Sequence, residues 1–157
     1  MTIARSGCLA ITVVTCGLVM ICSSQAQSGK TQAQQLVDSM MKKNADVAGL
    51  EVSATPAGKT TCETIAATEA KDLGEKCDED EFAALKAGKP FIEKEADGYD
   101  VTAPLRDANG KVVGTLGIDF KLQPGQTDAS ILQRTGELLK ELERQIPSKA
   151  FLFQPVS

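Results

Sequence analysis

The chain has 157 residues and a net charge of −4, with 17 lysines and arginines against 21 aspartates and glutamates. This length suits one ordinary domain with its own core, and the acidic balance argues against nucleic-acid binding. The absence of histidine excludes a Ser-His-Asp triad, histidine-bound zinc and histidine-ligated haem. With no tryptophan and only 4% aromatic residues, a carbohydrate platform of stacked rings is not expected.

Residues 1–26 are predicted to be a secretory signal peptide. Arg5 precedes an apolar run of 15 residues, and Ser24 and Ala26 are small residues at the −3 and −1 positions of a cleavage site. A membrane anchor is the alternative, but the run is shorter than the ~20 residues that a spanning helix needs. The domain over 27–157 is therefore expected to be periplasmic or secreted, without stable membrane insertion after cleavage.

Cleavage of the signal leaves two cysteines, Cys62 and Cys77. An even pair in an exported protein predicts a disulfide, and two free thiols or a redox site are the alternatives. Two cysteines without histidine cannot hold a structural zinc, so no metal and no cofactor is expected. Cys22 follows Ile21 rather than the small residue that a lipid anchor needs.

The first part of the mature chain predicts a helix followed by two strands. Apolar residues at spacings of three and four predict the helix from Thr31 to about residue 44. Strands are predicted over 47–55 and 61–68, and residues 69–80 form the longest irregular stretch.

A short helix is expected over 79–87, before the next strand. Asp78 is its expected N-cap, and Gly88 ends it. Phe82 and Leu85 are expected to point inward.

Three consecutive antiparallel strands are the clearest β pattern, and they are predicted over 91–96, 99–106 and 111–120. Asp97-Gly98 predicts a two-residue hairpin turn. Pro104 cannot donate to a ladder, which predicts a bulge or an unpaired position. Gly114 and Gly117 would weaken an ordinary strand and indicate that something approaches the sheet closely.

Alternation assigns the side chains of the last strand to two faces. Val112 and Phe120 are expected on one face, and Val113 and Asp119 on the other. A long amphipathic helix capped by Thr127 or Asp128 follows, with Pro147 after its end. The apolar tail over 151–156 is expected to fold back onto the body.

This order of elements predicts an α+β fold: an antiparallel sheet of about five strands with a long N-terminal helix, a short insert helix and a C-terminal helix. Within it, residues 50–120 resemble a Cache domain, an extracellular PAS-like sensor module. The resemblance rests on Ala67-Thr68-Glu69 with Asp72-Leu73-Gly74, and on the closing hairpin over 99–119. That hairpin has the pattern apolar-x-x-Pro-apolar, a turn glycine, then apolar-apolar-Gly-x-apolar-Gly.

The resemblance implies a small-molecule ligand, bound between the sheet and the loop–helix insert. The chain departs from the usual arrangement because it shows no second membrane helix and no kinase, cyclase or methyl-accepting segment. It is therefore expected to hold a ligand or to pass a signal to a partner such as a membrane sensor protein.

Candidate ligand-binding residues lie on the polar face of the hairpin. Alternation places Arg106 and Asp119 together with Thr102 and Thr115, where a guanidinium and a carboxylate could face a carboxylate-bearing or amphoteric metabolite. A solvated face and an internal salt bridge without ligand are the alternatives.

Other candidates come from the neighbouring segments. Tyr99 would add a hydroxyl and Lys94 an ammonium, and Thr68, Glu69 and Asp72 would form the rim of the pocket.

No enzymatic activity is expected. The acidic residues 75–81 lack the ligand spacing of an EF-hand and suit a helix start. A thiol enzyme using Cys62 or Cys77 is one alternative. A non-ligand-binding envelope interaction or scaffold protein, docking through its acidic surface and apolar tail, is the other.

Overall fold

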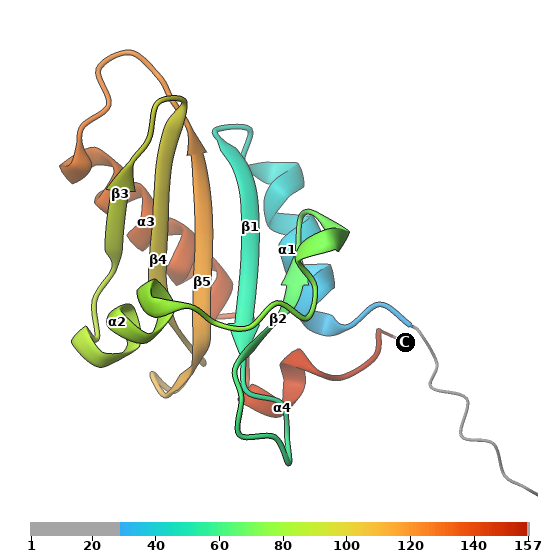
Figure 1. Cartoon of the computed structure of the whole chain (residues 1–157). Helices are drawn as coiled ribbons and strands as arrows, with labels where there is room; N and C mark the ends of the chain where they lie inside the picture. The colour runs from blue at the N-terminus through green and yellow to red at the C-terminus, as the bar shows by residue number, and fades with distance from the viewer. Residues whose placement is uncertain (1–28, 157) are drawn as a thin grey trace, which may run out of the picture.

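The computed structural model describes residues 29–156 as an α+β fold built on a five-stranded antiparallel sheet (Figure 1). Across the sheet the strands are ordered β2 (Glu63–Ala67), β1 (Val47–Ala54), β5 (Val112–Lys121), β4 (Gly98–Arg106) and β3 (Phe91–Lys94). The predicted fold class is confirmed. The predicted signal peptide, residues 1–26, lies outside the described residues.

Two helices cover one face of the sheet and enclose the apolar core (Figure 1). α1 (Gln32–Lys43) contacts β1 and β2, and α3 (Asp128–Glu143) contacts β4 and β5. The largest fully buried side chains come from both layers: Val37, Met40, Leu50, Leu105, Leu116, Ile118, Phe120, Ile131, Leu138, Leu142, Ile146 and Leu152. Of the helices in the described part of the chain, none combines the length and apolar character needed to cross a bilayer.

The opposite face of the sheet is crossed by the connection between β2 and β3 (Figure 1). We call this connection, residues 68–90, the cover segment. It contains the 3-10 turn η1 (Ala70–Asp72) and helix α2 (Glu79–Ala87), whose predicted bounds and Asp78 cap are confirmed. The prediction that Phe82 points inward is wrong: its side chain is 55% exposed, whereas Ala84 is 1% exposed.

The turn between β3 and β4 differs from the predicted Asp97-Gly98 turn. Gly98 already belongs to β4, its backbone carbonyl accepts from the Glu95 N–H, and its φ is not in the left-handed region. A side chain at Gly98 would overlap the carbonyl of Phe120. The glycine therefore serves close strand packing instead of turn geometry.

The predicted bulge lies close to Pro104 but not at it. Pro104 faces Thr115 in regular register, and the irregularity follows between Leu105 and Arg106. The pairing of β3 with β4 ends at Thr102, so the missing N–H of Pro104 falls where β4 has only β5 beside it.

The shift in register also reverses the predicted sides of two valines. Val113 is 2% exposed and joins the core, and Val112 is 40% exposed. A one-residue shift in register exchanges the two faces of a strand. Alternation therefore predicted the correct face only for the residues of β5 that follow the bulge, such as Leu116, Ile118 and Phe120.

The C-terminal tail folds back as predicted, through a short helix, α4 (Lys149–Leu152), that the sequence did not indicate. The Gln32 N–H donates to the Gln154 carbonyl at 2.8 Å, and the Val156 N–H donates to the Lys30 carbonyl at 2.9 Å. The two ends of the described chain therefore lie side by side (Figure 1).

Candidate functional site

Polar side chains occupy the centre of the sheet face that lies beneath the cover segment. Strand register places Glu51 and Thr102 on either side of Gly117, and it places Asp100 beside Asp119. Gly117 has no side chain, so the centre of this face is hollow.

A cavity of about 160 Å³ lies at this position, and we call it the sheet cavity. Its lining from the sheet is Glu51, Thr64, Asp100, Thr102, Gly117, Ile118 and Asp119, and its lining from the cover segment is Glu75, Lys76, Asp78, Asp80 and Glu81. Seven carboxyl groups therefore surround the cavity, against the single ammonium group of Lys76.

A second cavity of about 150 Å³ adjoins the first, and we call it the edge cavity. Its lining comprises Ala48, Gly49, Leu50, Glu51, Thr68, Glu69, Asp72 and Asp119. Glu51 and Asp119 line both cavities. Gly49 permits this arrangement, because a Cβ there would overlap the Asp119 carboxylate.

Glu51 lies in an environment that disfavours its charge. Burial raises the pKa of Glu51 to about 7, and the charges of Asp72 and Asp119, together with a hydrogen bond to Asp72, act in the same direction. The Glu51 carboxyl is therefore partly protonated near neutral pH.

The neighbouring carboxyls are perturbed in the same way. Burial raises the pKa of Asp100 to about 6, with the charge of Asp119 adding to the effect. Burial also raises the pKa of Asp119, with the charges of Asp72 and Glu69 acting in the same direction. Within residues 29–156, none of the ion pairs includes Glu51, Asp100 or Asp119.

The Thr102 hydroxyl is the second unusual group of the sheet cavity. Thr102 is 8% exposed, and its side chain makes no hydrogen bond within residues 29–156. Its oxygen is not sealed inside the protein but opens onto the cavity. The hydroxyl is therefore free to form a hydrogen bond with a group that enters the cavity.

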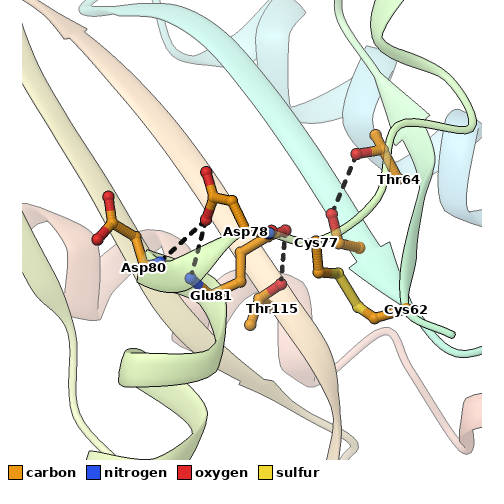
Figure 2. Close-up of a disulfide and its surroundings, with 8 residues drawn as sticks. Cys62, Thr64, Cys77, Asp78, Asp80, Glu81 and Thr115 are labelled. Atoms are coloured by element: carbon orange, nitrogen blue, oxygen red, sulfur yellow. Dashed lines mark hydrogen bonds between the residues drawn. A yellow bond between two sulfur atoms is a disulfide. The ribbon is translucent and has the colours of Figure 1, made fainter.

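The other hydroxyls on this face have protein partners. Thr115 donates to Glu81 Oε1 at 3.4 Å (Figure 2). The hydroxyls of Ser53 and Thr64 lie 3.2 Å apart. Thr102 therefore differs from its neighbours.

The predicted disulfide is present and fastens the cover segment to the start of β2 (Figure 2). Cys62 and Cys77 have Cα atoms 5.3 Å apart, and the Thr64 N–H donates to the Glu75 carbonyl at 2.8 Å. Lys76, which lines the sheet cavity, adjoins this bridge.

Two acidic side chains of the cover segment have structural roles. Asp78 Oδ1 accepts from the backbone N–H groups of Asp80 at 3.0 Å and Glu81 at 3.3 Å, and Glu81 Oε2 accepts from the Asp78 N–H at 2.7 Å (Figure 2). This capping box, with the bond from Thr115 to Glu81, holds the start of α2 over the sheet. It leaves five carboxyl groups of the sheet cavity without such a role.

The structure brings most of the predicted site residues to the two cavities. Thr102 and Asp119 line the sheet cavity, and Thr68, Glu69 and Asp72 line the edge cavity with Asp119. The Thr68 hydroxyl is already used locally, because it accepts from the Leu50 N–H at 2.9 Å.

Tyr99 does not reach the polar face. It is 3% exposed and belongs to the apolar core on the opposite face of the sheet. Lys94 is paired with it in register, and the Lys94 ammonium lies 5.6 Å from the centre of the Tyr99 ring. Neither residue lines either cavity.

The predicted pairing of Arg106 with Asp119 is wrong. Asp119 pairs with Asp100, whereas Arg106 lies six positions further along β4, opposite Val112, which corresponds to roughly 20 Å. The Arg106 guanidinium instead donates to the Gly110 carbonyl at 3.1 Å. Alternation predicts which face a side chain occupies, but not its position along the strand.

Glu51 and Asp100 were not predicted as site residues from the sequence. The available indication was one carboxyl in each of three predicted strands, at positions that alternate with apolar residues.

Comparisons with known proteins give likeness in fold without likeness in sequence. No family model matches the chain, and no curated protein matches it. A putative transcriptional regulator from Rhodococcus sp. RHA1 has a TM-score of 0.50 at 12% identity, over 73% of this chain and 68% of that chain.

Two further solved structures are similar at lower TM-scores. The GAF domain of a two-component sensor histidine kinase from Bacillus halodurans has a TM-score of 0.49 at 14% identity, over 72% of this chain and 89% of that chain. The Agobacterium tumefaciens repressor BlcR has a TM-score of 0.48 at 11% identity, over 74% of this chain and 67% of that chain. These likenesses concern the fold alone. The five-stranded antiparallel sheet with its helices is consistent with a PAS/GAF-like fold.

Proposed function

We propose that this chain is a Cache-like, small-molecule-binding domain whose ligand is a small organic cation held in the sheet cavity. The observation that carries the proposal is the set of three carboxyl groups, Glu51, Asp100 and Asp119, which take part in no ion pair within residues 29–156.

Electrostatics favour a positively charged ligand. Burial next to like charges raises the free energy of each ionised carboxyl, and the pKa values of all three groups are raised accordingly. An ammonium or guanidinium group would relieve this cost and donate charge-assisted hydrogen bonds.

The expected carboxylate on the ligand stays a prediction. Arg106, its expected partner, lies outside both cavities, so Lys76 is the cationic side chain available to it in the sheet cavity. A zwitterion with its ammonium toward Asp119 and its carboxylate toward Lys76 satisfies both expectations.

Export, signalling and the lack of catalysis are further parts of the proposal. The signal-like residues 1–26 and the disulfide support a periplasmic or secreted location, with a membrane sensor as the partner. Reversible binding without covalent chemistry is supported by the absence of histidine from the sequence and by the pairing of Cys62 with Cys77.

Thermal-shift assays at pH 8 with alkylammonium ions, guanidines, amino acids and dicarboxylates test the function. A ligand at a hundred times its Kd stabilises the fold by about 2.7 kcal/mol, and we expect this from cations but not from dicarboxylates. Asp119→Asn should weaken the response, and Asp128→Asn, an equal charge change at the start of α3, should not. Stabilisation by dicarboxylates alone, unchanged in Asp119→Asn, would contradict the proposal.

The alternative is a non-ligand-binding interaction or scaffold protein. The observation that favours it is the exposure of Leu73 at 46% and Phe82 at 55% on the cover segment. The tail is less suitable for docking, because Leu152 is buried in the core. If a Leu73→Ser, Phe82→Ser variant lost a co-purifying partner while keeping its thermal stability, the result would support this alternative.

A further inference from the structure

The sheet cavity and the edge cavity share two lining residues, Glu51 and Asp119. Each cavity has additional carboxyl groups of its own. Asp100 belongs to the sheet cavity, and Glu69 and Asp72 belong to the edge cavity. Negative charge therefore continues through both cavities.

Thr102, which lines the sheet cavity but not the edge cavity, offers a hydroxyl group that is suited to a hydrogen-bonding ligand. The Thr102 hydroxyl opens onto the cavity, and the residue is 8% exposed. Because this hydroxyl has no partner within residues 29–156, it is an observation independent of the carboxyls. It can accept a hydrogen bond from an ammonium group that Asp100, two positions away on the same face, neutralises.

We propose that the two cavities together form one site for a linear dication of the diamine class. One ammonium group binds among Thr102, Asp100 and Asp119, and the other binds among Glu51, Asp72 and Glu69. This inference rests on the proposed function, because it specifies the cation as one with two separated charges.

The dimensions of the sheet set the length of the ligand. Thr102 on β4 and Glu51 on β1 flank Gly117 on β5, and neighbouring strands are about 4.8 Å apart, so the two ends of the site are roughly 10 Å apart. Gly117 leaves the middle open for the apolar part of the ligand. A short diamine cannot reach both ends, and a long one must fold.

Two lysines lie close to the proposed site. Lys76 lines the sheet cavity, and Lys71 pairs with Glu69 at 2.8 Å. Both lysines are exposed and can move into solvent when a ligand enters, so they reduce the affinity without closing the site.

The test is calorimetric titration of the full-length chain at pH 8 with α,ω-diamines from ethane-1,2-diamine to dodecane-1,12-diamine. Each diamine is compared with the n-alkylamine of the same carbon number. We expect the tightest binding at an intermediate length, with Kd at least about tenfold below that of the matched monoamine, equivalent to about 1.4 kcal/mol.

Variants assign the two ammonium groups to the two cavities. Asp72→Asn and Glu69→Gln should each reduce the ratio of diamine to monoamine affinity, since both residues line the edge cavity and neither lines the sheet cavity. Thr102→Val should weaken both ligands, and Asp128→Asn should affect neither.

The outcomes separate the two proposals. If diamines bind no more tightly than monoamines at every length, the two-cavity inference is overturned and the cation-binding function stands. If no amine binds, both fail. If Asp72→Asn weakens monoamines and diamines equally, the second ammonium position is overturned.

Discussion

Glu51 shows how one side chain can make the stability of this domain depend on pH. Its pKa in the folded chain is about 7, against 4.5 ordinarily, so the native state binds more protons than the unfolded state between those values. Stability is then highest at the acidic side of this window and falls as the pH rises through it. Asp100, with a pKa of about 6, acts in the same direction.

Glu51→Gln should flatten this dependence. We expect the free energy of unfolding of the unsubstituted protein to fall by roughly 1–2 kcal/mol between pH 5 and pH 8. The free energy of unfolding of the variant should fall by less over the same range. Urea denaturation at both pH values measures the difference. An equal loss in the two proteins would show that Glu51 is not the group responsible.

Thr102 and Thr115 provide a matched pair for separating binding from folding. Thr115 donates to Glu81, so Thr115→Val should lower the free energy of unfolding by about 1 kcal/mol. Thr102→Val removes no hydrogen bond among residues 29–156 and should leave stability unchanged while weakening amine binding. A loss of stability in Thr102→Val comparable to that in Thr115→Val would show that its hydroxyl is used inside the protein.

The cover segment is held over the sheet near its middle, at Cys77 and at the start of α2. The Cys62–Cys77 disulfide fastens it to β2, and the capping box at Asp78 and Glu81 fixes the start of α2. Since residues of this segment line both cavities, fastening the segment also preserves the shape of the site.

Loss of the disulfide should therefore affect both stability and binding. Cys62→Ser with Cys77→Ser is expected to lower the free energy of unfolding by about 3 kcal/mol, from the entropy of a 15-residue loop. Amine affinity should fall as well, because the carboxyl groups that the cover segment contributes to the sheet cavity, such as Glu75 and Asp80, lose their fixed position. Chemical denaturation and calorimetry check the two effects, and unchanged affinity in the folded variant would show that the capping box alone positions the cover segment.

In the whole molecule, the two faces of the sheet have different roles. One face carries the core under α1 and α3, and the other carries the cavities under the cover segment (Figure 1). The tail contributes to the core, since α4 contacts α1 and Leu152 is 1% exposed.

Leu152→Ala should consequently destabilise the fold without changing the site. A cost of about 2–5 kcal/mol is expected from the cavity it creates, with amine affinity retained at temperatures where the variant is folded. Thermal unfolding measures the cost. A change below about 1 kcal/mol would mean that the tail is only loosely attached.

Local chemistry in the sequence determined the elements of this protein. Helix periodicity, the Asp78 cap, the β-branched strands and the alternation of Tyr99 to Leu105 predicted the α+β fold, and the cysteine pair predicted the bridge. Each of these patterns acts over a few residues or, for the cysteines, depends on residue type alone. They therefore hold without knowledge of the neighbouring strands.

Only the tertiary structure decided which charges meet. Strand register places Glu51, Asp100 and Asp119 around Gly117, while the bulge beyond Leu105 and the length of the hairpin keep Arg106 away. Register depends on how β1, β5 and β4 pair across long stretches of chain, and a sequence pattern confined to one strand contains no information about it. The cation-binding character of the site follows from that pairing.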